Sequence, residues 1–150
     1  MPASQAQVEL DRFIDKFSPA VATRTRVEIV RMRALLPCAI EMVYDNYNAL
    51  AIGYSPSERA SEAIFSLAVF PRWVTLCFLQ GAGLPDPHGM LKGAGNQVRH
   101  IRLIEDSLLL SAPVRALMAS ALKHAKVPLS PHTKYRLVIK SVSARQRPRR

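Results

Sequence analysis

The sequence has 150 residues, of which 49% are hydrophobic and 21% are charged, and its formal net charge is +10. This length suits one domain of the commonest size, and the hydrophobic fraction is too high for a disordered chain. No apolar run approaches the roughly 18–20 residues that a membrane span needs, and the first residues lack the basic and apolar regions of a signal peptide. We therefore expect a globular domain without a membrane partner.

The positive charge is concentrated near the C-terminus. Seven of the 21 Lys and Arg residues lie within 134–150, a segment that holds none of the 11 Asp and Glu residues. The rest of the chain is nearly balanced, so its composition alone does not indicate a nucleic-acid-binding domain. Cys38 and Cys77 are the only cysteines, and their spacing fits neither a disulfide framework nor a zinc motif. We interpret both as reduced core residues of a cytoplasmic protein.

Two helices are predicted first. Ser4, with a glutamine three residues later, fits a capping box, and apolar residues then recur at helical spacing up to residue 17. Ser18 followed by Pro19 marks a second helix start, because serine caps well and proline fits the first helical position. This helix is expected to end before Pro37. The two helices together predict an αα-hairpin.

The apolar period then changes from 3.6 to 2, which is typical of strands. Five strands are predicted, at 40–45, 49–54, 63–70, 73–79 and 98–103. The first two flank a turn rich in Asn and Asp. The third and fourth are apolar on both faces, as expected for central strands. The first four follow one another closely and predict an antiparallel meander.

A final helix is expected to begin at Ser111, with Pro113 in its first turn, and to end before Pro128. Residues 135–140 alternate again and predict an edge strand, and 143–150 are expected to form a disordered basic tail. The fold class is thus α+β, with residues 1–142 as a single domain. We expect an antiparallel sheet of five or six strands with the αα-hairpin and the last helix on one face. The other face would be partly open to a ligand.

Residues 80–103, with the sequence QGAGLPDPHGMLKGAGNQVRHIRL, carry five of the six glycines and connect two predicted strands. Read with the meander and the opening helix, this segment resembles the signature of the YdhG-like domain family, over roughly residues 5–125. The residues that match the family pattern in order are Gly83, Leu84, Pro85, Asp86, Pro87, Gly89, Leu91, Gly93, Gly95, Arg99, His100 and Ile101.

The resemblance implies a small bacterial cytoplasmic α+β domain, and at least one member of the family is described as frataxin-like and linked to iron delivery. Frataxin-type iron binding uses a ridge of carboxylates. Here the second predicted helix carries four arginines against one glutamate, Glu28, and a basic face repels a cation. The resemblance therefore supports the fold more than an iron-chaperone role. Iron is the cofactor that the resemblance suggests. Most members of the family have no assigned function.

The glycine-rich segment also holds the candidate ligand-binding residues, which are Asp86, His88, Lys92, Gly93, Gly95, Arg99 and His100. Bare backbone N–H groups at the glycines, beside a lysine and an arginine, are suited to an anion. The glycines alternatively serve only tight turns, and Asp86 only fixes the local backbone. The histidines and Asp86 match no standard metal motif, so no metal ligand is assigned.

Nothing in the sequence indicates an enzyme, since no GxSxG motif or nucleophile with an arguable base partner is present. We therefore expect a non-catalytic domain that binds a small anion or a metal-bearing partner. The alternative is a module that binds nucleic acid, another polyanion or a protein through the basic tail. Arginines in this tail could contact phosphates without sequence specificity, and they are Arg145, Arg147, Arg149 and Arg150.

Overall fold

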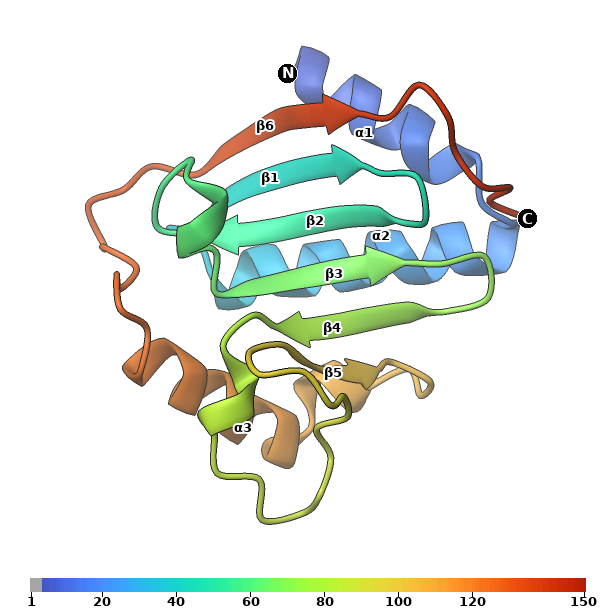
Figure 1. The fold of residues 1–150 in the computed structure, drawn as a ribbon. Coiled ribbons are helices and arrows are strands. Elements are labelled where there is room, and N and C mark those ends of the chain that lie inside the picture. Colours follow the sequence, from blue (N-terminus) through green and yellow to red (C-terminus); the bar gives the residue numbers. More distant parts are fainter. Residues whose placement is uncertain (1–3) are drawn as a thin grey trace.

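The computed structural model describes residues 4–150, in which three α-helices and one open six-stranded sheet form an α+β fold, as expected (Figure 1). The α-helices are α1 (Gln5–Asp15), α2 (Pro19–Leu35) and α3 (Ala112–Lys123). The strands are β1 (Ile40–Asp45), β2 (Leu50–Ser55), β3 (Phe65–Val69), β4 (Val74–Phe78), β5 (Arg99–Arg102) and β6 (Arg136–Val142). Short 3-10 helices are η1 (Ala60–Glu62), η2 (Gly81–Gly83) and η3 (Leu108–Leu110).

The two N-terminal helices begin where their capping residues predict. The Gln7 N–H donates to the Ser4 hydroxyl at 3.1 Å, and the Val21 N–H donates to the Ser18 hydroxyl at 3.4 Å. The third helix differs, because the Ser111 hydroxyl donates backwards to the Leu108 carbonyl at 2.7 Å and does not cap the helix. Among residues 4–150, no helix has both the length and the hydropathy that crossing a bilayer requires.

The strands follow the order β5-β4-β3-β2-β1-β6, and β1 to β5 form the antiparallel meander that the sequence predicts. The sheet is not antiparallel throughout, however, because β6 pairs with β1 in parallel. In Figure 1, α3 carries the chain back along the sheet before β6 begins. The last strand therefore enters in the same direction as β1, and it forms the edge position that was expected.

The core lies between one face of the sheet and the three helices, which are behind the strands in Figure 1. Alternate side chains of the central strands fill it, and Phe65, Leu67, Leu76 and Phe78 are fully buried there. The intervening side chains face the other side, which no α-helix covers. The sequence correctly indicated that β3 and β4 are central, and their second face carries small residues that keep some contact with solvent.

The last eight residues, which were expected to form a disordered tail, contact the domain through Arg149 and Arg150, while Ala144, Arg145, Arg147 and Pro148 are exposed. Arg149 is 5% exposed and its guanidinium lies 2.9 Å from the buried Asp45 carboxylate. It also donates to the Asn46 carbonyl at 2.6 Å, and Arg150 donates to the Lys16 carbonyl at 3.1 Å. These contacts anchor the segment that follows residue 142 to the β1–β2 turn and to the end of α1.

Candidate functional site

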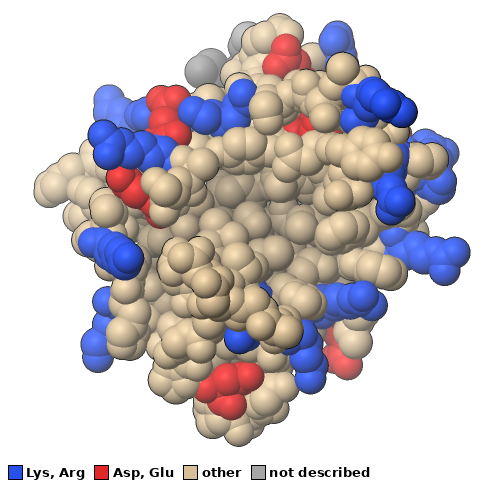
Figure 2. Space-filling model, in the orientation of Figure 1, with Lys and Arg blue, Asp and Glu red and all other residues tan. Residues whose placement is uncertain are grey.

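The helix-free side of the sheet, called the open face below, has small side chains in its middle. Strand pairing aligns two rows of residues across it. One row consists of Met42, Gly53, Ser66, Cys77 and His100. The next row consists of Tyr44, Ala51, Ala68, Thr75 and Arg102. Strands β2, β3 and β4 thus contribute only small residues, with larger ones on β1 and β5. Figure 2 shows this side of the molecule, hollowed in the middle.

Cationic groups gather where β5 borders the open face. The Arg102 guanidinium stacks on the Trp73 ring, 3.9 Å from its centroid, which leaves the N–H edge of the guanidinium available to an acceptor. Beside it, Lys92 and His100 exchange two backbone hydrogen bonds of 2.9 Å, so that Lys92 extends the sheet by one position. A cavity of about 560 Å³ at this edge is lined by Lys92, His100 and Arg102 together with four apolar residues, Met90, Ile101, Ile104 and Leu108. This cationic edge is the part of the open face best suited to an anion.

Further basic residues lie around the open face. Lys140, in the bulge of β6, donates to the Glu58 carbonyl at 3.2 Å, and Arg136 is paired with the Glu58 carboxylate at 3.0 Å. Arg147 lines a cavity of about 820 Å³ beside the β3–β4 turn. Figure 2 shows the middle of the hollow free of charged side chains and Lys and Arg on several sides of it. Such a distribution attracts anions to a surface that offers apolar contact.

Asp86 organises the glycine-rich loop from within. Its two carboxylate oxygens accept the backbone N–H groups of Met90 and Leu91, each at 2.9 Å. The N–H of Leu91, followed by that of Met90, holds the pKa of Asp86 below its ordinary value. Gly89 has φ +62°, a conformation that glycine adopts without strain. The carboxylate is thus already satisfied by the loop, which fits the structural alternative given for Asp86.

Arg99 is likewise engaged by its own loop. Its guanidinium donates to the Gly95 carbonyl at 2.6 Å and to the Val98 carbonyl at 2.9 Å. Gly93 has φ +121°, and an added Cβ there would lie 3.2 Å from the Val98 carbonyl oxygen. Carbonyl oxygens therefore converge on this arginine, and the loop is not arranged as a cradle of N–H groups for an anion around it.

The seven residues predicted from the glycine-rich segment do not form one site. Asp86 and His88 line a cavity of about 210 Å³ against α3, whereas Lys92 and His100 line the cavity at the cationic edge. Gly93 and Gly95 lie in the loop that follows Lys92, and Arg99 is the first residue of β5. Sequence reasoning did not select Arg102 as a ligand-binding residue, and the alternation of small residues in β2 and β3 was a signal that could have marked the open face.

The four arginines of the C-terminal segment lie in different environments. Arg149, which was predicted to contact a phosphate, is buried and its guanidinium is paired with Asp45. Arg150 donates to the carbonyls of Lys16 and Asp15. Arg145 and Arg147 are exposed, and the Arg147 guanidinium lies 6.0 Å from the Tyr47 ring centroid. Only these two keep an exposed side chain without bonds to the end of α1 or to Asp45.

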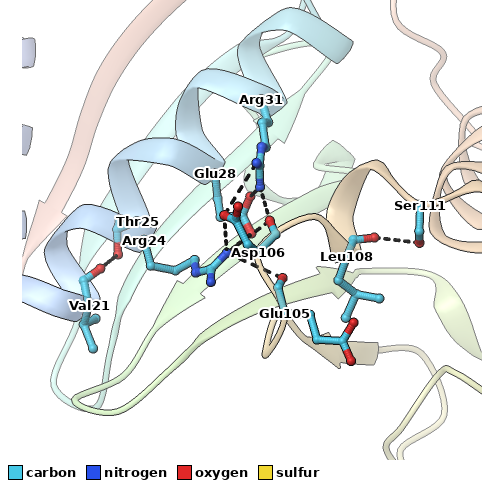
Figure 3. Close-up of polar contacts among 9 residues, drawn as sticks. All are labelled: Val21, Arg24, Thr25, Glu28, Arg31, Glu105, Asp106, Leu108 and Ser111. Carbon is cyan, nitrogen blue, oxygen red and sulfur yellow. Dashed lines mark hydrogen bonds and ion pairs between the residues drawn. The ribbon is translucent and has the colours of Figure 1, made fainter.

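A buried glutamate lies on the helical side, where Figure 3 shows its neighbours. Glu28 receives a hydrogen bond from Arg31 at 2.9 Å, and Arg24 lies 4.0 Å from its second oxygen, which has no hydrogen-bond partner among residues 4–150. Burial raises the pKa of Glu28 above 4.5. Arg24 also pairs with Asp106 at 3.2 Å, and Arg31 donates to the Asp106 carbonyl. This cluster fastens the loop after β5 to α2.

The open face carries little reactive chemistry. Burial raises the pKa of the Cys77 thiol, which keeps it protonated and a weak nucleophile at neutral pH. Residues 4–150 contain no group of three or more His, Cys, Asp or Glu side chains placed to hold a metal ion. What the arrangement offers is charge, stacking surface and apolar contact, and these suit binding.

Comparison with models of protein families, with curated proteins and with solved structures found no match to this chain. The resemblance to the YdhG-like family therefore stays a prediction from the sequence.

Proposed function

We propose that the chain is a non-catalytic binding domain that holds an anionic ligand on the open face, with the anionic group at the cationic edge. The observation that carries this proposal is the hollow of small side chains bordered by the Trp73–Arg102 stack. The ligand's apolar or planar body would lie over Ala68 and Cys77. Its anionic group would meet Arg102 and Lys92, which form no ion pair with any residue of 4–150.

Three further elements belong to this proposal. The protonated Cys77 thiol supports a non-catalytic role, and the two free cysteines support a cytoplasmic location. A metal-bearing ligand such as haem combines a planar apolar ring with carboxylates and fits the same description. A YdhG-like, iron-chaperone-like role would depend on such a ligand, because the exposed groups around the hollow are mainly basic and repel free iron.

Titration with phosphate, nucleotides, haem and ferrous iron tests this proposal. Arg102→Gln should weaken binding of the anionic ligand by about tenfold, the size expected when a charge-assisted hydrogen bond is lost. Arg115→Gln is the matched control, because Arg115 is exposed on α3. Ala68→Trp should block the hollow, and Ala34→Trp on the exposed side of α2 should not. If no ligand binds, or if the open-face variants bind as their controls do, the proposal is wrong.

The polyanion alternative is favoured by a separate observation, the number of basic side chains around the hollow in Figure 2. A single-stranded nucleic acid would place phosphates on this border and would stack bases on Trp73. Its affinity should fall with salt, with a slope of about −0.7 per phosphate contact. Arg147→Gln should reduce that slope, whereas Arg149→Met should not, because Arg149 is buried. A nucleic-acid affinity that does not change with salt concentration would exclude this alternative.

A further inference from the structure

Another cavity lies away from the open face, at the end of the sheet where β4 leads into η2. It has a volume of about 540 Å³ and is enclosed by η1, the end of β4 and the C-terminal end of α3. These elements are at the left of Figure 1. It shares no residue with the two rows of the open face. Its volume is within the range of about 300–1,000 Å³ that is usual for small-molecule sites.

The walls of this cavity are apolar. Phe78 is fully buried and Ile64 is 7% exposed. Opposite them, α3 and the residue after its last turn contribute Ala121 and Ala125, one helical turn apart, and their small size leaves the space unfilled. The Ile64 backbone is already paired, since its N–H donates to the Tyr54 carbonyl at 2.9 Å and its carbonyl accepts the Leu79 N–H at 3.0 Å. The interior therefore offers contact to an apolar group and little else.

The acidic group at this cavity already has partners, whereas the lysine has none in the described part of the chain. The Glu62 carboxylate is occupied, because it accepts the Ser57 hydroxyl at 2.7 Å and lies 3.8 Å from Arg59. Lys126 forms no ion pair with a residue of 4–150. His124 uses Nδ1 to bond the Ser120 carbonyl at 2.8 Å, which leaves Nε2 for another partner. A ligand in this cavity would therefore have the ammonium group of Lys126, which forms no ion pair with the described residues, beside an apolar interior.

From this combination we propose that the cavity binds a small organic acid with an unbranched apolar body. The apolar chain lies against Phe78, Ala121 and Ala125, and the carboxylate lies at the mouth with Lys126. A neutral or cationic molecule of the same shape would lack that partner. This site is independent of the open face, so either one can fail without affecting the other.

Decanoate is the probe for this site. Amide NMR spectra of the full chain should show saturable shifts at Ile64, Ala121 and Ala125 when decanoate is added, with the residues of the open face unmoved. Decanol, which has the same chain without a charge, should bind more weakly than decanoate. Absence of saturable shifts, or shifts confined to the open face, would overturn the proposal.

Two pairs of variants separate the apolar and the charged parts of the site. Ala121→Trp fills the cavity and should weaken decanoate binding by roughly tenfold or more, while Ala119→Trp, on the exposed side of α3, should not. Lys126→Gln should weaken decanoate by about two- to fivefold, the effect of one exposed ion pair, and should leave decanol unchanged.

Lys123→Gln is the control for Lys126, because it removes a neighbouring exposed charge that does not line the cavity. Circular dichroism checks that each variant is folded. If Ala121→Trp does not fold, the NMR shifts that decanoate causes in the unaltered chain test the proposal by themselves. Equal decanoate affinity in Ala121→Trp and Ala119→Trp, both folded, would overturn the proposal, as would equal losses in Lys126→Gln and Lys123→Gln.

Discussion

The docking of the C-terminal segment predicts that Arg149→Met destabilises the protein. Methionine retains much of the aliphatic bulk of arginine and removes the guanidinium. The side chains of Asp45 and Arg149 are 0% and 4% exposed, and their charged groups lie 2.9 Å apart. The change therefore leaves a buried carboxylate with one cation fewer. An arginine in a flexible tail would have no such partner to lose.

The size of the effect follows from what remains around Asp45. Removing one partner of a buried ion pair costs about 3–5 kcal/mol, because the other charge stays buried. Here Lys16 still lies 3.0 Å from the second carboxylate oxygen, although its own side chain is 43% exposed. We therefore expect a smaller loss, about 2–3 kcal/mol in the free energy of unfolding. With a urea slope of about 1–3 kcal/mol per molar, the midpoint should fall by roughly 1–2 M.

Urea unfolding followed by Trp73 fluorescence and by circular dichroism measures this loss. Arg150→Met is the matched control, because Arg150 is exposed and its loss should change the free energy of unfolding by about 0.5 kcal/mol or less. Asp45→Asn combined with Arg149→Met should cost less than the two single changes together, since the neutral amide needs no cation. Equal midpoints for Arg149→Met and Arg150→Met would refute the argument that Arg149 anchors the segment.

Three other contacts predict measurable changes. Gly81→Ala should cost about 1–3 kcal/mol, because the added carbon would lie 2.7 Å from a side chain of β5, whereas Gly83→Ala, with nothing within 4 Å, should cost far less. Asp86→Asn should speed hydrogen exchange at the Leu91 amide. In the unaltered chain this protection should be complete above the ordinary pKa of Asp86 and should be lost as pH falls through its lowered folded value. Glu28 has a raised folded pKa, so the unaltered chain should gain stability as pH falls through that value towards 4.5, and Glu28→Gln should remove this gain.

Local patterns predicted most of the fold because they depend on neighbours in the sequence. The caps at Ser4 and Ser18 and the alternation in the meander require only nearby residues, and both were confirmed. The parallel pairing of β6 was missed, because strand direction depends on how α3 returns the chain. The anchoring of Arg149 was missed for a similar reason, since its partner Asp45 lies 104 residues away and no local pattern marks it.

The candidate site was predicted only in outline. The sequence indicated an open sheet face beside the glycine-rich loop. The predicted site, however, joined seven residues of that segment because their chemistry suits an anion, without knowing which of them lie together. The structure uses Asp86 and Arg99 within the loop and brings Arg102 to Trp73, a contact that depends on how β4 and β5 are aligned. The alternation of Ala51 and Gly53, and of Ser66 and Ala68, did mark one side of the sheet as small. To predict what such a surface binds, one must also know which charged side chains surround it in the folded chain.

The charges around the open face also argue against a second copy of this chain as its occupant. The net charge is +10, and two open faces pressed together would bring both Arg102 side chains and both Lys92 side chains near one another. Like charges across an interface cost several kcal/mol, and salt relieves part of that cost. We therefore expect light scattering to report a monomer at low ionic strength, with any self-association increasing as salt is added. A dimer that is strongest at low salt would contradict this reasoning.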